Sequence, residues 1–73
     1  MSAAFDLFIS DLFHLYNRLL TAPLGKRDWV IASGHRALSV LRAYRPEGEG
    51  EDILIETAVE QFEELVIKAG GQP

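Results

Sequence analysis

The chain has 73 residues, no cysteine and a formal net charge of −4 at pH 7. This length allows one small domain, the missing cysteines exclude disulfides and thiolate metal sites, and the acidic balance argues against general nucleic-acid binding, which depends on neutralising phosphates. Hydrophobic residues make up 48% of the chain. Because a small domain has much surface per residue, this fraction indicates self-association.

The first predicted element is an amphipathic helix over residues 3–21. From Phe5 onward, apolar side chains recur at three- and four-residue steps and leave only a narrow polar stripe. Ser2 is a candidate N-cap, and Pro23 disfavours continuation of the helix. The apolar face is wider than the roughly 100° that one neighbouring helix covers. We therefore expect a second copy of the chain or another protein to cover the remainder.

Large side chains of this face are the predicted anchors for a partner, because aromatic residues dominate the energetics of protein interfaces. The predicted partner-binding residues are Phe5, Phe8, Leu12, Tyr16 and, from the second helix, Trp29. They predict a homodimer or larger oligomer that also binds another protein.

The hydropathy of the first helix does not indicate a membrane segment. Residues 1–20 lack the basic start of a signal peptide, and Asp6 and Asp11 interrupt their apolar run. No stretch approaches the ~20 uncharged apolar residues of a membrane span. We expect a cytoplasmic protein.

The second predicted helix covers residues 27–45, with Asp28 as its candidate N-cap. Gly34 weakens its middle, because glycine in a helix interior costs roughly 1 kcal/mol relative to alanine. One interpretation is that Gly34 lets a bulky neighbour, such as a phenylalanine of the first helix, pack closely. The other is a kink or the close approach of a ligand. The packing interpretation is favoured.

A break at 46–50, with one proline and two glycines, separates this helix from a third over residues 52–69. Lys68 in its last turn suits the helix dipole, and Gly70 is a natural residue just past its end. Residues 70–73 are expected to be a frayed tail. Because the connections are short, the sequence predicts an all-α, up-down-up three-helix bundle that forms one domain and self-associates through its first helix.

Polar and basic side chains follow one side of the second helix at three- and four-residue spacing. They are His35, Arg36, Ser39 and Arg42, with Arg45 beyond them. The alternative function that this stripe indicates is binding of a small anionic ligand or a nucleic-acid backbone, with an aromatic side chain for stacking.

The same arginines can instead pair with glutamates of the third helix, and this interpretation is favoured. In an antiparallel hairpin the expected pairs are Arg45 with Glu51, Arg42 with Glu56, and Arg36 with Glu60. Exposed pairs contribute only ~0–1 kcal/mol each. They would nevertheless neutralise the stripe and set the register of the hairpin.

The sequence contains no pattern typical of catalysis or cofactor binding. Its serines lack a nucleophile-elbow context, and its glycines lack the spacing and lysine of a phosphate-binding loop. His14 and His35 have no glutamate at the spacing that di-metal helical bundles use. We expect no enzyme activity, no cofactor and no metal site. The predicted function is a small helical protein–protein interaction module with a regulatory, adaptor or inhibitory role.

Overall fold

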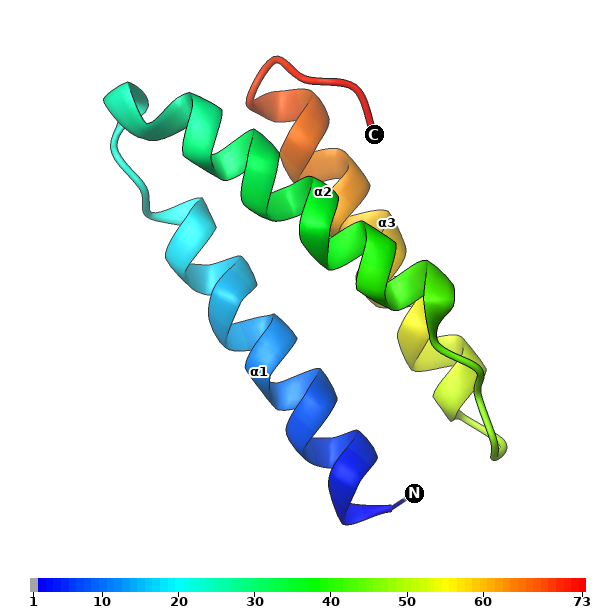
Figure 1. The fold of residues 1–73 in the computed structure, drawn as a ribbon. Coiled ribbons are helices and arrows are strands. Elements are labelled where there is room, and N and C mark those ends of the chain that lie inside the picture. Colours follow the sequence, from blue (N-terminus) through cyan, green and yellow to red (C-terminus); the bar gives the residue numbers. More distant parts are fainter. Residues whose placement is uncertain (1) are drawn as a thin grey trace.

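The computed structural model describes residues 2–73 as three α-helices and one short 3-10 helix (Figure 1). The elements are α1 (Ala3–Leu20), η1 (Leu24–Lys26), α2 (Arg27–Ala43) and α3 (Glu51–Lys68). Consecutive helices run antiparallel, so the two chain ends lie at opposite ends of the molecule (Figure 1). The predicted all-α three-helix bundle is confirmed. Within the described residues, no helix combines the length and hydropathy needed to cross a lipid bilayer.

α1 begins as its sequence predicts. The Ser2 Oγ accepts a hydrogen bond from the backbone N–H of Phe5 at 3.1 Å, so the predicted N-cap is confirmed. At the other end, the Thr21 hydroxyl lies 3.2 Å from the carbonyl oxygens of Asn17 and Arg18 and donates to them. The Asn17 carbonyl also accepts the Thr21 N–H at 3.3 Å, and the hydroxyl adds a partner for the Arg18 carbonyl in the last turn of the helix.

α2 begins at Arg27, as predicted, but its N-cap residue and its end differ from the prediction. Lys26, not Asp28, is its N-cap, and the Lys26 side chain makes no capping bond. Asp28 lies inside the first turn, where its charge favours the helix dipole. The helix stops at Ala43, two residues earlier than predicted. Tyr44 is already extended, because the chain must leave helical geometry before Pro46.

The core forms where the three helices meet. Its buried apolar residues are Phe5, Ile9, Leu12 and Leu19 of α1, Val30, Ala37, Leu38 and Leu41 of α2, and Ile55, Ala58, Phe62, Leu65 and Val66 of α3. α2 and α3 form the most extensive helix pair, and α1 packs mainly against α3. α1 therefore approaches α2 less closely than α3 does.

Gly34 allows the close approach of α2 and α3, as the packing interpretation predicts. The glycine is buried, and a Cβ atom added to it would meet the side chain of Val66. α2 runs unbroken through this point. The bulky neighbour comes from α3 rather than from a phenylalanine of α1.

The chain after α3 folds back instead of fraying. Gly70 has a φ of +96°, a left-handed conformation that favours glycine and confirms the predicted helix end. The Gly71 N–H then donates to the Val66 carbonyl oxygen at 2.9 Å. The His35 Nε2–H donates to the Gln72 carbonyl oxygen, which ties the tail to α2. Gly71 and Gln72 therefore bond to α3 and α2, in contrast to the frayed tail predicted over residues 70–73.

Candidate functional site

The residues of α1 predicted as partner anchors are mostly covered by the chain itself. Phe5 is 2% exposed and Leu12 is 9% exposed, so both belong to the core. Phe8 is half-buried and stacks on Tyr44, with ring centroids 5.0 Å apart and ring planes inclined by 16°. Phe5 also contacts the Tyr44 ring, at 5.4 Å between centroids. Tyr44, the first residue after α2, thus covers the aromatic start of α1.

Tyr16 is half-buried and meets the Phe62 ring edge-on, at 5.5 Å between centroids. Such a pair stabilises a fold by about 0.5–1.5 kcal/mol beyond its buried area. Phe5, Phe8 and Tyr16 thus each have an aromatic neighbour within the chain. Of the five predicted anchors, Trp29 is the one that stays exposed, at 38%.

The predicted anion-binding stripe of α2 does not converge on one site. Arg42 and His35 face α3: the Arg42 guanidinium donates to Glu63 Oε2 at 2.7 Å, and His35 bonds the tail. Arg36 faces α1 and donates to Ser33 Oγ at 3.4 Å. Ser39 is exposed. His35, Arg36 and Arg42 thus have three different partners, which are the tail, Ser33 and Glu63.

The predicted ion pairs between α2 and α3 are corrected by the structure. Arg42 pairs with Glu63, two helical turns beyond Glu56. Glu51 is buried and accepts hydrogen bonds from the Tyr44 hydroxyl at 3.3 Å and from the Glu47 N–H at 3.1 Å, rather than from Arg45.

Arg36 forms no ion pair with Glu60 within residues 2–73. The predicted pairs were counted outward from the loop between α2 and α3. That count assumes that the two helix axes do not cross and that each side chain reaches only the residue directly opposite. Packed helices cross at an angle, and an arginine side chain spans more than one helical turn, so this count misassigns the pairs.

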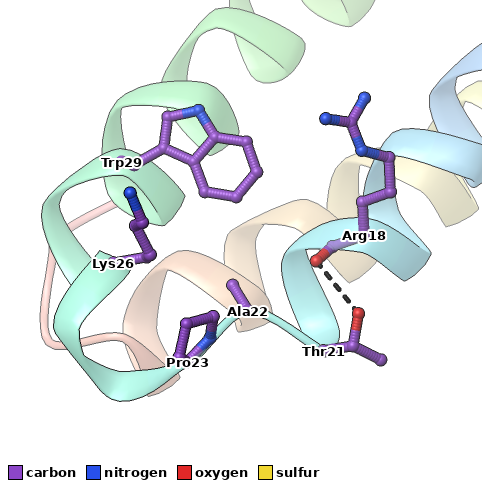
Figure 2. Close-up of a pocket in the computed structure, with 6 residues that line it drawn as sticks. All are labelled: Arg18, Thr21, Ala22, Pro23, Lys26 and Trp29. Carbon is purple, nitrogen blue, oxygen red and sulfur yellow. Dashed lines mark hydrogen bonds between the residues drawn. The ribbon is translucent and has the colours of Figure 1, made fainter.

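Two neighbouring hollows lie between α1 and α2, the two helices that pack less closely against each other than either packs against α3. The first, of about 200 Å3, is lined by Leu12, Leu15, Ser33, Arg36, Ala37 and Val40. The second, of about 440 Å3, is lined by Arg18, Thr21, Ala22, Pro23, Lys26 and Trp29 (Figure 2). One helical turn separates Leu15 from Arg18, and one separates Ser33 from Trp29. The hollows are therefore consecutive, and together they form the α1–α2 groove.

The end of the groove near the α1–η1 connection combines cations with an aromatic ring. The side chains of Arg18, Lys26 and Trp29 line the second hollow, called the notch below (Figure 2). Neither Arg18 nor Lys26 forms an ion pair with a carboxylate of residues 2–73. The Thr21 hydroxyl is engaged with backbone carbonyls (Figure 2). The notch thus offers two positive charges and one face of an indole.

The middle of the groove is mainly apolar. Val40 is 49% exposed, and Leu15 is half-buried. Arg36 adds a third cation without a carboxylate partner in the described part of the chain. The acids closest in sequence to the groove residues are Asp11, one turn before Leu15 on α1, and Asp28, beside Trp29 in the first turn of α2. The groove therefore presents apolar side chains with an excess of positive charge, on a chain whose net charge is −4.

Other hollows also combine apolar residues with cations. One of about 460 Å3, at the end of the bundle, is lined mostly by apolar residues and includes Leu24, Arg27 and Lys68. Lys68 pairs with Glu64 of its own helix. Another, between α2 and α3, contains Arg42, which is already paired with Glu63. Within residues 2–73, no group of three or more potential ligand side chains could hold a metal ion. No protein-family model, curated protein or solved structure matches the chain.

Proposed function

We propose that the protein is a protein–protein interaction module that binds an acidic amphipathic helix along the α1–α2 groove. The observation that supports this function is the alignment of exposed apolar side chains with three cations that form no ion pair with a carboxylate of residues 2–73. Such a surface complements a helix that carries both apolar and acidic side chains. Whether this binding serves a regulatory, adaptor or inhibitory role depends on which protein carries that helix.

The shape of the groove suits a helix better than an extended segment. α1 and α2 are antiparallel neighbours, and a third helix laid between them would form a layer on the side opposite α3. Along α2, the groove extends from Trp29 to Val40, eleven residues or about 16 Å, which matches three turns of a docked helix. Recognition of this kind uses apolar anchors spaced by three or four residues.

Different residues of the groove would contribute in different ways. Trp29 is the strongest candidate for an energetic hot spot, because tryptophan buries a large rigid surface at interfaces. Leu15 and Val40 would add apolar area at about 25 cal/mol per Å2. Arg18, Lys26 and Arg36 would mainly accelerate association and select the acidic partner.

A designed probe tests this function directly. It is a helical peptide of about 18 residues with leucines at three- and four-residue steps and glutamates elsewhere. Its matched control has lysine in place of each glutamate. Titration into 15N-labelled protein should shift the amides of Leu15, Arg36 and Val40 and the Trp29 indole N–H. Shifts spread over the whole surface, or equal affinity for the lysine peptide, would contradict the proposal.

A variant pair separates the groove from general surface charge. Arg36→Gln should weaken binding of the glutamate peptide about fivefold, or about 1 kcal/mol. Arg45→Gln, which removes an exposed arginine outside the groove, should leave the affinity unchanged.

The alternative predicted from the sequence, anion binding by the stripe of α2, has less support. Arg42 is bonded to Glu63, and His35 is bonded to the tail. Arg36 is the remaining cation of that set without a charged or tail partner, and it lines the groove.

A further inference from the structure

We infer that the helix bound in the α1–α2 groove is α3 of a second copy of this chain, so that copies join head to tail. This inference rests on the proposed function and identifies its partner. It follows from a second surface whose charge and apolar pattern complement the groove.

That second surface is the outer stripe of α3. Its exposed residues recur at steps of three and four and therefore share one face: Ile53, Glu56, Thr57, Glu60, Glu64 and Ile67. Ile53 is 63% exposed and Ile67 is 56% exposed, so each end of the stripe carries an uncovered apolar side chain. Three glutamates lie between them. The stripe is thus an acidic amphipathic helix face of the kind that the groove would bind.

The two surfaces carry opposite charges over similar lengths of helix. The groove has three cations, and the outer stripe has three glutamates, with the exposed Asp52 one turn before Glu56 and the exposed Lys68 one turn after Glu64. Glu56 and Glu60 form no ion pair within residues 2–73, and Glu64 pairs with Lys68 of its own helix at 3.1 Å. From Glu56 to Glu64 the carboxylates span about 12 Å of helix, and from Lys26 to Arg36 the cations span about 15 Å.

Charge also disfavours the symmetric alternatives. If two grooves met, Arg18, Lys26 and Arg36 would face the same cations of the other copy. If two outer stripes met, glutamates would face glutamates. Like charges opposite each other at an interface disfavour association. The pairing of groove with stripe brings opposite charges together.

The two surfaces lie on separate parts of the molecule. The outer stripe is the solvent face of α3, whereas the groove lies between α1 and α2. One copy can therefore use both surfaces at once. A contact between unlike surfaces continues from copy to copy and produces a ring or an open filament.

Mixing two variants tests this arrangement. The groove variant is Arg18→Gln with Arg36→Gln, and the stripe variant is Glu56→Lys with Glu60→Lys. All four residues are exposed, so circular dichroism should show the wild-type helix content. In sedimentation at micromolar concentration, the wild type should grow in mass as concentration rises. Each variant alone should be mainly monomeric, and an equimolar mixture should form a 1:1 dimer that grows no further.

The dimer follows because the mixture contains one intact groove, on the stripe variant, and one intact stripe, on the groove variant. A charge variant outside both surfaces, Glu49→Lys with Arg45→Glu, should assemble like the wild type. The wild-type assembly should weaken as NaCl rises from about 0.05 M to about 0.5 M, because salt screens exposed charges.

Three results would overturn the inference. They are a wild type that stays monomeric, a stripe variant that assembles like the wild type, and a mixture that stays monomeric. If the wild type is monomeric but the glutamate peptide still shifts the groove residues, the proposed function stands and the head-to-tail partner is rejected. If the peptide also fails to bind the groove, both are rejected.

Discussion

A Cβ atom built on Gly34 would lie 2.5 Å from Cγ2 of Val66, closer than real Cβ atoms approach their neighbours. Val66 is fully buried in the core, so its methyl group has no free space into which to move. The absence of a side chain at Gly34 therefore sets how closely α2 and α3 can pack at the middle of the bundle.

Gly34→Ala should lower the free energy of unfolding by about 1–2 kcal/mol, as measured by urea denaturation. Overpacking a tight site costs about 1–3 kcal/mol, and the better helix propensity of alanine returns up to about 1 kcal/mol. Gly25→Ala is the matched control, because nothing lies within 4 Å of its Cβ position. If Gly34→Ala were as stable as Gly25→Ala, the close contact with Val66 would not limit the packing.

Gly71→Ala should release the tail from α2. Its Cβ would lie 2.9 Å from Cγ2 of Ile31, so the tail must move away and lose the bond to Val66. The loss of that bond should cost about 0.5–1.5 kcal/mol. Hydrogen exchange should show a faster rate at the residue-71 amide, with unchanged exchange in the α2–α3 core. Unchanged exchange at residue 71 would mean that the tail contact tolerates a side chain.

The loop before α3 should make the protein less stable at high pH. Partial burial of the phenol, with the negative charge and hydrogen bond of Glu51, raises the pKa of Tyr44 above its ordinary value of 10.0. The folded state therefore holds this proton more tightly than the unfolded state. The contribution of this proton to the free energy of unfolding is fully present below about pH 10. It is lost as the pH rises through the raised pKa of Tyr44.

The titration can be followed by 13C NMR at Tyr44 Cζ. Glu51→Gln should lower the pKa of Tyr44 toward its ordinary value, because it removes the nearby negative charge. A Tyr44 titration that does not respond to this change would show that Glu51 has no influence on the phenol.

The Arg42–Glu63 pair should contribute little to stability. Its side chains are 50% and 35% exposed, and exposed pairs are typically worth ~0–1 kcal/mol. A double-mutant cycle with Arg42→Gln and Glu63→Gln should give a coupling energy below about 1 kcal/mol that decreases with salt. A larger coupling that persists in high salt would indicate that water is excluded from the pair.

Much of the fold could be predicted from helical periodicity and from residues that act locally. The Ser2 cap and the Gly70 helix end depend on neighbours within a few positions, and both were predicted correctly. The packing role of Gly34 was also predicted, although its neighbour was not. Identifying Val66 required the crossing of α2 over α3, which a single helix pattern does not contain.

The surface was harder to predict, because it depends on which residues meet across helices. The stacking of Phe8 on Tyr44 covers part of the wide apolar face that periodicity assigned to α1, whereas Leu7 and Leu20 stay exposed. The division of His35 and Arg36 between two sides of α2 depends on where α1 and α3 pack. A helical wheel for α2 places His35 and Arg36 close together, but it does not show that they face different neighbouring helices.

The loose approach of α1 to α2 has a consequence for local unfolding. α2 and α3 share the most extensive contact and are further joined by the tail, whereas α1 packs mainly against α3. α1 can therefore detach while the α2–α3 hairpin stays paired, and native-state hydrogen exchange should be fastest in α1 among the three helices. A helix bound in the α1–α2 groove would hold α1 in place, so binding should slow amide exchange along α1, including at residues that the bound helix does not touch.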